Sequence, residues 1–173
     1  MKSLLLTGGT GHLGRIVVDR LSPEYRCVLL GRNETPKVDR VYGILQIAGG
    51  FAMGSSLDDF TTMLDANLLS AVRAIEPMRD KIEDGGRIIA ISSIASRTTP
   101  AGLAAYASAK AALNAYIEVL AKDLKSRRIG VNALLPTTLG DDGIPYERVA
   151  EMIVFLLSEA AASLTGQLIA MTL

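Results

Sequence analysis

Apolar residues follow two alternating patterns along this chain. Short continuous apolar runs predict strands that are buried on both faces, and these runs are Ser3–Thr7, Arg26–Leu30, Tyr42–Ala48, Arg87–Ser92, Ile129–Leu135 and Gln167–Met171. Longer stretches with helical spacing predict helices at Leu13–Leu21, Leu57–Met78, Ala104–Ser126 and Tyr146–Ser158. Strands that alternate with helices in this way are typical of an α/β fold, in which helices cover both faces of a parallel sheet.

Length and composition limit the classes of protein to which this chain can belong. The 173 residues, of which 49% are apolar, suffice for a buried core, and we expect a single domain over residues 1–173. A formal net charge of zero gives no indication of a nucleic-acid partner. No apolar run approaches the length of a membrane span, so we expect no membrane partner either.

The rarer residue types bear on location and on metal chemistry. Cys27 is the only cysteine, so no disulfide can form within the chain, which fits a reducing cytoplasm. Glycines interrupt the apolar N-terminus after Thr7, and Arg15 and Asp19 follow, which argues against a signal peptide. We therefore expect a cytoplasmic protein. The single histidine, His12, gives no basis for a histidine metal site, and we expect no metal.

A glycine-rich loop joins the first predicted strand to the first predicted helix. It contains G-x-G-x-x-G at Gly9, Gly11 and Gly14, in the strand-loop-helix context that the motif requires. Glycines permit a tight turn and close approach of the backbone to a pyrophosphate, and the helix N-terminus offers free N–H groups. A purely structural turn is the alternative. The residues that we expect to bind a dinucleotide here are Thr7, Gly8, Thr10, Gly11, His12, Leu13 and Gly14.

Arg32 follows the second predicted strand and bears on the choice of dinucleotide. An acidic residue at this place would bind the ribose hydroxyls of NAD, whereas an arginine suits the 2′-phosphate of NADP. We therefore expect NADP(H) to be favoured over NAD(H), with Arg32 in the cofactor site. The alternative is a solvated cation at the end of a strand.

Tyr106 and Lys110 lie four residues apart in a predicted helix, which puts them on one helix face. A nearby ammonium favours the phenolate and lowers the pKa of a tyrosine. Lowering that pKa from about 10 to about 7 would need roughly 4 kcal/mol, since each pKa unit corresponds to about 1.4 kcal/mol. The pair is therefore a candidate acid-base unit, although the same spacing also occurs by chance on solvated helix faces.

Further motifs follow the glycine loop in a fixed order. The segment Gln46–Gly50 contains the Ala-Gly of an N-N-A-G motif, and Leu164–Gln167 contains a Thr-Gly pair before the last predicted strand. Together with Y-x-x-x-K at Tyr106 and Lys110, this series resembles the short-chain dehydrogenase/reductase family from end to end, with gaps. The other residues that match are Asn67, Ser93 and the strand Val131–Pro136 with its proline.

This resemblance implies a doubly wound Rossmann-type sheet and hydride transfer between NADP(H) and a carbonyl or alcohol substrate. It implies that Tyr106 donates a proton, that Ser93 stabilises the substrate oxygen, that Lys110 tunes Tyr106 and holds the nicotinamide ribose, and that Asn67 positions a water. Long alanine-rich helices resemble the faces that form family homodimers and homotetramers. The remaining cofactor-binding residues that the resemblance implies are Ala48, Gly49, Gly50, Tyr106, Lys110, Pro136, Thr137 and Thr138.

Two segments that the family normally has are missing. After Thr35 there is no room for the third strand and its flanking helices, and after Leu139 there is no long substrate loop. The chain is either a shortened member of the family or a sequence from which residues are absent. The missing segments leave open a second function, that of a sensor or scaffold that binds NADP without turnover. Local similarity to the dihydropteridine reductase-like bacterial branch, in A-G-G-F-A and L-P-T-T-L, leaves open a pterin reductase.

Overall fold

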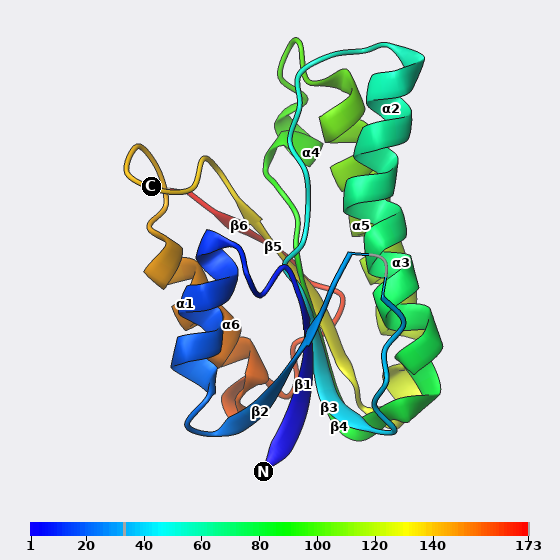
Figure 1. Ribbon diagram of the computed structural model, residues 1–173, viewed down its shortest axis with the longest axis vertical. Coiled ribbons are helices and arrows are strands. Elements are labelled where there is room, and N and C mark those ends of the chain that lie inside the picture. Colours follow the sequence, from blue (N-terminus) through cyan, green and yellow to red (C-terminus); the bar gives the residue numbers. More distant parts are fainter. Residues whose placement is uncertain (33, 173) are drawn as a thin grey trace.

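Parallel strands form the centre of the computed structural model, which describes residues 1–32 and 34–172 (Figure 1). These residues form one six-stranded sheet in the order β2-β1-β3-β4-β5-β6. The strands are β1 (Lys2–Thr7), β2 (Tyr25–Leu30), β3 (Val41–Gln46), β4 (Ile82–Ile91), β5 (Gly130–Pro136) and β6 (Leu168–Met171). Every pairing is parallel, so the predicted α/β class and doubly wound parallel sheet are confirmed.

Helices cover both faces of this sheet because successive strand residues point to opposite sides. Leu4 and Leu6 pack with α1 (His12–Leu21) and α6 (Tyr146–Leu157) on one face. Leu5 points to the other face, whose buried core includes residues of α3 (Ser70–Ile75) and α5 (Ala104–Asp123). Figure 1 shows the two helical layers on either side of the strands. Among the described residues, no helix is both long and apolar enough to cross a membrane.

The sheet lacks one strand on the side of β2. In the doubly wound order 3-2-1-4-5-6, a third strand would lie outside the second. Here β2 is the edge strand, and residues 34–40 run from it to β3 without a helix or strand. The predicted absence of the third strand and its flanking helices is therefore confirmed for the described residues.

Three local predictions differ from the structure. The helix expected over Leu57–Met78 is divided into α2 (Leu57–Leu64), a π-helix η1 (Asp65–Leu69), α3 and a 3₁₀-helix η2 (Glu76–Lys81). Strand β4 begins at Ile82 rather than Arg87, because the pair Gly85 and Gly86 forms a bulge within the strand, with φ +76° at Gly85. Short helices were also not predicted, namely α4 (Ala95–Thr98), η3 (Lys125–Arg127) and η4 (Glu159–Ala161).

Arg87 is a fully buried arginine at the base of β4, only 2% exposed. Its Nε donates to the carbonyl oxygen of Leu156 at 3.2 Å, and its Nη2 donates to that of Ser158 at 3.5 Å, at the C-terminal end of α6. Its Nη1 donates to the carbonyl oxygens of Gly85 and Gly86. A cation at a helix C-terminus satisfies carbonyls that lack intrahelical partners and interacts favourably with the helix dipole. Arg87 therefore fixes α6 to the sheet.

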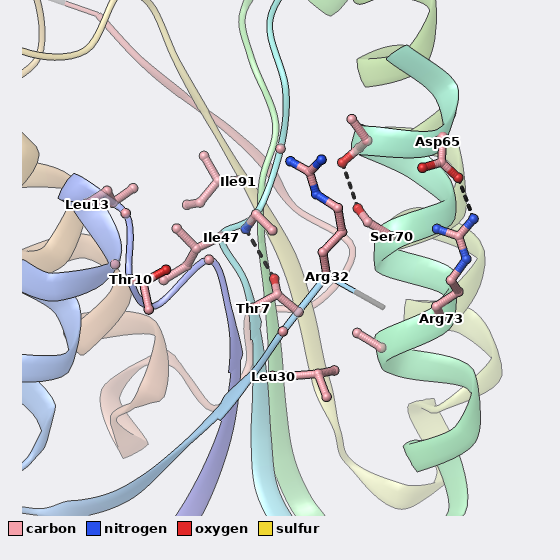
Figure 2. A pocket seen from close by; sticks show the side chains of 18 of the residues that line it. Thr7, Thr10, Leu13, Leu30, Arg32, Ile47, Asp65, Ser70, Arg73 and Ile91 are labelled. Carbon is pink, nitrogen blue, oxygen red and sulfur yellow. Dashed lines mark hydrogen bonds and ion pairs between the residues drawn. The ribbon is translucent and has the colours of Figure 1, made fainter. Parts of the chain in front are cut away.

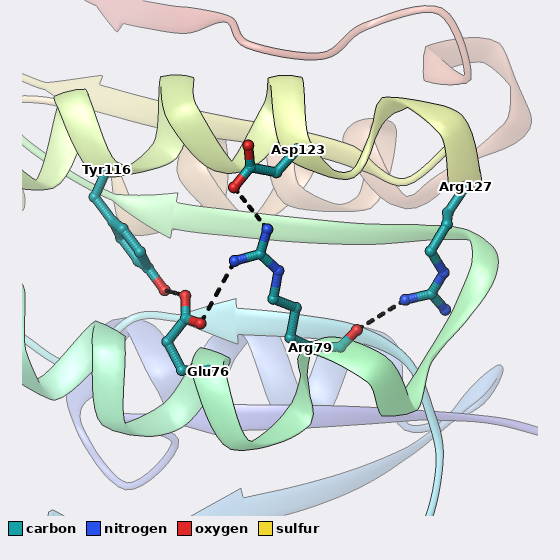
Figure 3. Close-up of polar contacts among 5 residues, drawn as sticks. All are labelled: Glu76, Arg79, Tyr116, Asp123 and Arg127. Atoms are coloured by element: carbon teal, nitrogen blue, oxygen red, sulfur yellow. Dashed lines mark hydrogen bonds and ion pairs between the residues drawn. The ribbon is translucent and has the colours of Figure 1, made fainter.

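A polar network joins the end of α3 to α5 (Figure 3). Tyr116 donates to Glu76 at 2.7 Å, and Arg79 bridges Glu76 and Asp123, with an N···O distance of 2.6 Å to Asp123. Arg127 donates to the carbonyl oxygen of Arg79 at 2.9 Å. Burial and the hydrogen bond to the Glu76 carboxylate raise the pKa of Tyr116, which keeps it a proton donor. The network therefore holds η2, which directly follows α3, against α5, the helix that carries Tyr106 and Lys110.

Candidate functional site

A cleft of about 780 Å³ lies at the carboxyl ends of β1, β2 and β3 (Figure 2). Its walls come from the glycine loop, from residues that follow β2 and β3, and from the helical segment α2–η1–α3. Ligands of open parallel sheets bind at this edge, where the strand order reverses, and the volume is within the usual range for ligand pockets.

The glycine loop forms one wall in a conformation that side chains would prevent. Gly8 has φ +69°, and a Cβ there would lie 2.6 Å from the amide nitrogen of Ala48. A Cβ on Gly14 would lie 2.1 Å from the carbonyl oxygen of Gly8. Gly11 is the N-cap of α1 and supplies no capping side chain, so the first turn of the helix keeps N–H groups for an anion. The loop therefore fits the pyrophosphate of a dinucleotide.

A buried network fixes the loop after β3 against the glycine loop. Thr7 donates from its hydroxyl to Oε1 of Gln46 at 2.9 Å and accepts from the amide of Ala48 at 3.1 Å. Nε2 of Gln46 donates to the carbonyl oxygen of Ala48 and to the hydroxyl of Ser70. Gln46 is fully buried and occupies a place where the N-N-A-G motif has asparagine. These contacts show that the Gln46 side chain links the glycine loop, the loop after β3 and Ser70 of α3.

Most of the predicted cofactor residues share this cleft. The lining residues among them are Thr7, Gly8, Thr10, Gly11, His12, Leu13, Gly14, Arg32, Ala48 and Gly49. His12 also packs its ring against Tyr146, with centroids 4.4 Å apart. The predicted residues that do not line it are Gly50, Tyr106, Lys110, Pro136, Thr137 and Thr138.

The segment after β5 turns back on itself, which explains why its threonines lie outside the cleft. The amide of Thr137 donates to the carbonyl oxygen of Met171 at 3.1 Å, and the carbonyl oxygen of Thr138 accepts from Ile144 at 2.8 Å. Leu139, which was not predicted, lines the cleft instead. Cofactor contacts from Pro136, Thr137 and Thr138 stay predictions.

Asn67 lies in the π-helix η1 with its side chain fully buried. Its Oδ1 accepts from the amide of Gly50 at 3.1 Å, and its Nδ2 donates to the carbonyl oxygens of Gly50 and Met63, each at 3.0 Å. These bonds attach the loop after β3 to the helix. The predicted role of Asn67 in positioning a water stays a prediction, because its side chain is bonded to backbone groups in this arrangement.

Ser93 and Tyr106 come together from different elements. Ser93 follows β4, and its Oγ accepts from the amide of Ala95 at 3.2 Å, which begins α4. Tyr106 lies in the first turn of α5, half-buried, with the ring of Phe51 against it edge to face at 5.0 Å. Burial raises the pKa of Tyr106, and a hydrogen bond with Ser93 partly offsets this rise. Ser93 and Tyr106 therefore lie near each other, and their catalytic roles stay predictions.

Lys110 is buried one turn beyond Tyr106 on α5 and is 4% exposed. Its Nζ donates to the carbonyl oxygen of Ile91 at 2.9 Å and lies 5.8 Å from the centroid of the Tyr106 ring. Burial lowers the pKa of Lys110 to about 8. The expected lowering of the tyrosine pKa by the lysine is not found in this arrangement, because burial dominates at Tyr106 and Lys110 is bonded to a backbone carbonyl.

Replacing Lys110 with methionine is expected to stabilise the cofactor-free protein at neutral pH. The drop in the pKa of Lys110 from 10.5 to about 8 corresponds to roughly 3 kcal/mol for holding the buried charge. Loss of the hydrogen bond to Ile91 reduces this stabilisation by about 1 kcal/mol. Below pH 8 the buried Lys110 stays charged in the folded wild type, so the wild type carries the full free-energy cost of burying that charge. Its stability then rises from about pH 8 to 10.5, where the unfolded chain keeps a proton that the folded chain has released.

Urea unfolding of both proteins at pH 7 and pH 10 measures this effect. The advantage of Lys110→Met should be about 2 kcal/mol at pH 7 and should shrink toward pH 10, since other titrating groups are common to both proteins. An advantage that is the same at both pH values would contradict a depressed lysine pKa.

Several known proteins are similar to this chain in sequence. A family model described as enoyl-(acyl carrier protein) reductase matches residues 38–143, a range that contains all four predicted catalytic residues. A 3-oxoacyl-[acyl-carrier-protein] reductase of Chlamydia pneumoniae is 28% identical over 192 aligned residues, which cover 96% of this chain and 77% of that protein. An NADPH-dependent aldehyde reductase-like chloroplast protein of Arabidopsis thaliana is 26% identical, over 65% of this chain and 43% of that protein.

The fold has close counterparts among solved structures. A short-chain dehydrogenase family protein of Francisella tularensis superposes with a TM-score of 0.88 at 22% identity, covering 99% of this chain and 97% of that one. The chain nevertheless spans only about half the length of several curated relatives, from 43% to 58%. Because the family model matches more than half of the chain, the chain belongs to the short-chain dehydrogenase/reductase family of oxidoreductases.

Proposed function

We propose that this protein is an NADP(H)-dependent oxidoreductase that interconverts a small-molecule carbonyl compound and the corresponding alcohol. The observation that carries the proposal is the position of Gly49, which lines the cleft. A Cβ on Gly49 would lie 2.8 Å from Oδ1 of Asn67 and 3.2 Å from Nζ of Lys110. The amide of Asn67 and the ammonium of Lys110 therefore lie directly behind the wall of a cleft that fits a dinucleotide.

The cofactor proposal rests on the glycine loop and on Arg32. The loop offers backbone N–H groups and a helix N-terminus to the pyrophosphate, and Arg32 lines the same cleft after β2. NADPH dependence is part of the name of one curated relative, which agrees with this choice. When bound, NADP(H) supplies the hydride that reduces the carbonyl carbon, and the protein supplies placement and protons.

Tyr106 acts as the general acid in the reductive direction. Its phenol donates a proton to the carbonyl oxygen of the substrate as that oxygen gains charge. The hydroxyl of Ser93 donates a hydrogen bond to the same oxygen and stabilises the developing negative charge. A raised pKa keeps the Tyr106 phenol protonated at neutral pH, which suits a proton donor.

Lys110 and Asn67 assist proton transfer by Tyr106. Lys110 holds the nicotinamide ribose and promotes proton release from Tyr106 when it turns from the carbonyl oxygen of Ile91. Asn67 fixes the loop that contains Gly50 and positions a water on the proton path. The proposed catalytic set is therefore Asn67, Ser93, Tyr106 and Lys110.

A direct assay tests the proposal. The loss of NADPH absorbance is followed with a panel of aldehydes, simple ketones, 3-oxoacyl thioesters and a quinonoid dihydropterin. Turnover of a carbonyl compound supports the proposal, and turnover of the dihydropterin alone would instead support the pterin reductase suggested by A-G-G-F-A. NADPH that neither binds nor reacts would overturn it.

A sensor or scaffold that binds NADP without turnover is the second candidate. Two observations favour it: Nζ of Lys110 is bonded to the carbonyl oxygen of Ile91, and burial raises the pKa of Tyr106 rather than lowering it. The short turn Gly140–Gly143, in place of a long substrate loop, points the same way. Tight NADPH binding without reaction of any compound in the panel would favour this function.

The assembly and location of the protein follow from the same proposal. Leu69 of η1 and Val119 of α5 are 42% and 53% exposed on the helical layer that also carries the network of Figure 3. Exposed apolar groups on this layer support a homodimer or homotetramer, and we place the protein in the cytoplasm as part of the same proposal. Light scattering of the purified protein gives the order of the assembly.

A further inference from the structure

We propose that Arg73 on α3 is a second guanidinium ligand for the 2′-phosphate of NADP(H), across the cleft from Arg32. This inference rests on the proposed cofactor and adds a specificity residue outside the motifs discussed so far. Both arginines line the same cleft, Arg32 from the segment after β2 and Arg73 from the helical wall (Figure 2).

The missing third strand explains why a residue of α3 can reach this part of the cleft. Because β2 is the edge strand, no further strand or helix of residues 1–32 and 34–172 lies between the segment after it and the helical wall. Ser70 and Ala74, on the same wall, are small. Arg73 is the long cationic side chain that α3 contributes to the lining of the cleft, and it is about half exposed.

The π-helix determines the orientation of Arg73. Asp65 and Arg73 are eight residues apart, which in a regular α-helix is about 80° beyond two full turns. The wider turn of η1, Asp65–Leu69, removes much of this offset, so that the two side chains share one face. Arg73 Nη2 donates to Asp65 Oδ1, and the pair faces the cleft.

The charges around this end of the cleft suit a phosphate better than they suit the free ribose of NAD. Arg32 and Arg73 provide two cations, and Glu34 and Asp65 are the acidic residues in the same lining. Glu34 accepts from the amide of Gly31 at 3.0 Å, so one of its oxygens is already bonded. The Asp65–Arg73 pair is about half exposed, and ion pairs of this kind are weak. Arg73 can therefore exchange Asp65 for a phosphate, to which arginine binds in a bidentate manner.

Titration of NADPH and NADH into the full-length protein tests the proposal without relying on turnover. Arg73→Met should weaken NADPH binding roughly tenfold or more, as expected for a lost charged hydrogen bond, and should change NADH binding by less than about twofold. The probe 2′,5′-ADP should follow NADPH, and 5′-AMP should follow NADH. Arg148→Met, on the exposed face of α6, is the matched control and should change neither.

Asp65→Asn separates a direct contact from a general effect of charge. If Arg73 contacts the phosphate, Asp65→Asn should tighten NADPH binding when Arg73 is present. The same substitution should increase NADPH affinity much less in the Arg73→Met background. Equal gains in both backgrounds would overturn the contact, as would an Arg73→Met loss that is the same for NADPH and NADH.

The outcomes also distinguish this inference from the proposed function. Equal affinity of the wild type for NADH and NADPH would overturn a 2′-phosphate site while dinucleotide binding stands. Failure of the wild type to bind either dinucleotide would overturn both. Circular dichroism of each variant confirms that it is folded.

Discussion

Replacing Tyr106 with phenylalanine is expected to lower carbonyl turnover by about 10²- to 10⁴-fold, the usual contribution of a positioned general acid. The substitution removes only the hydroxyl that donates the proton and leaves the ring packed against Phe51. NADPH affinity should change by less than about twofold, because Tyr106 does not line the dinucleotide cleft. Steady-state kinetics and a separate NADPH titration give the two quantities.

Tyr116→Phe is the matched control, since it makes the same change on the same helix. Tyr116 donates to Glu76 on the outer side of α5, so its loss should cost about 1 kcal/mol of stability and leave turnover near that of the wild type. Near-normal turnover in Tyr106→Phe would contradict the assignment of the acid. The pH profile adds a check: reductive turnover should decline only at alkaline pH, because burial raises the pKa of Tyr106.

Replacing Arg87 with methionine is expected to destabilise the fold by about 3 to 5 kcal/mol. Methionine keeps an apolar side chain in the buried site but removes every donor to the carbonyl oxygens at the end of α6 and in the bulge of β4. Buried carbonyls that lose their partner are costly because no water replaces it. For a chain of this length the loss corresponds to a fall in Tm of roughly 10 °C.

Arg148→Met on α6 is the control for this experiment. Arg148 is paired with Glu151 on the solvent face, at 72% and 48% exposure, and its loss should change stability by less than about 0.5 kcal/mol. Urea unfolding of both variants, compared through their midpoints, measures the difference. A cost below about 1 kcal/mol for Arg87→Met would show that water or a shifted backbone replaces the guanidinium.

The order of strands and helices could be predicted because it depends on short-range properties of the chain. Continuous apolar runs need burial on both faces, and the glycine loop needs backbone conformations that Gly8 and Gly14 permit. The helix carrying Tyr106 and Lys110 has strong helix formers along its length, so its bounds lie within a few residues of those expected.

The features that were missed depend on partners far away in the sequence. Arg87 donates to the carbonyl oxygen of Leu156, 69 positions away in the sequence. No local pattern indicates that an arginine in a strand will bond to the C-terminal carbonyl groups of a distant helix. The bulge in β4 lies in its pairing with β3, and the π-helix carries Asn67, which is bonded to Gly50 in the distant loop after β3. The pKa of Lys110 likewise follows from its depth of burial, which a motif does not encode.

The free edge at β2 has a consequence for engineering the chain. The segment missing between β2 and β3 would lie at the edge of the sheet. Its loss therefore removes only an edge strand and leaves every remaining strand pair intact. The same edge is then a place where sequence can be added. Asp39 and Arg40 are exposed just before β3, whereas Pro36 is buried. A peptide or a small folded domain inserted between Asp39 and Arg40 should leave the hydrogen-bonded ladder undisturbed.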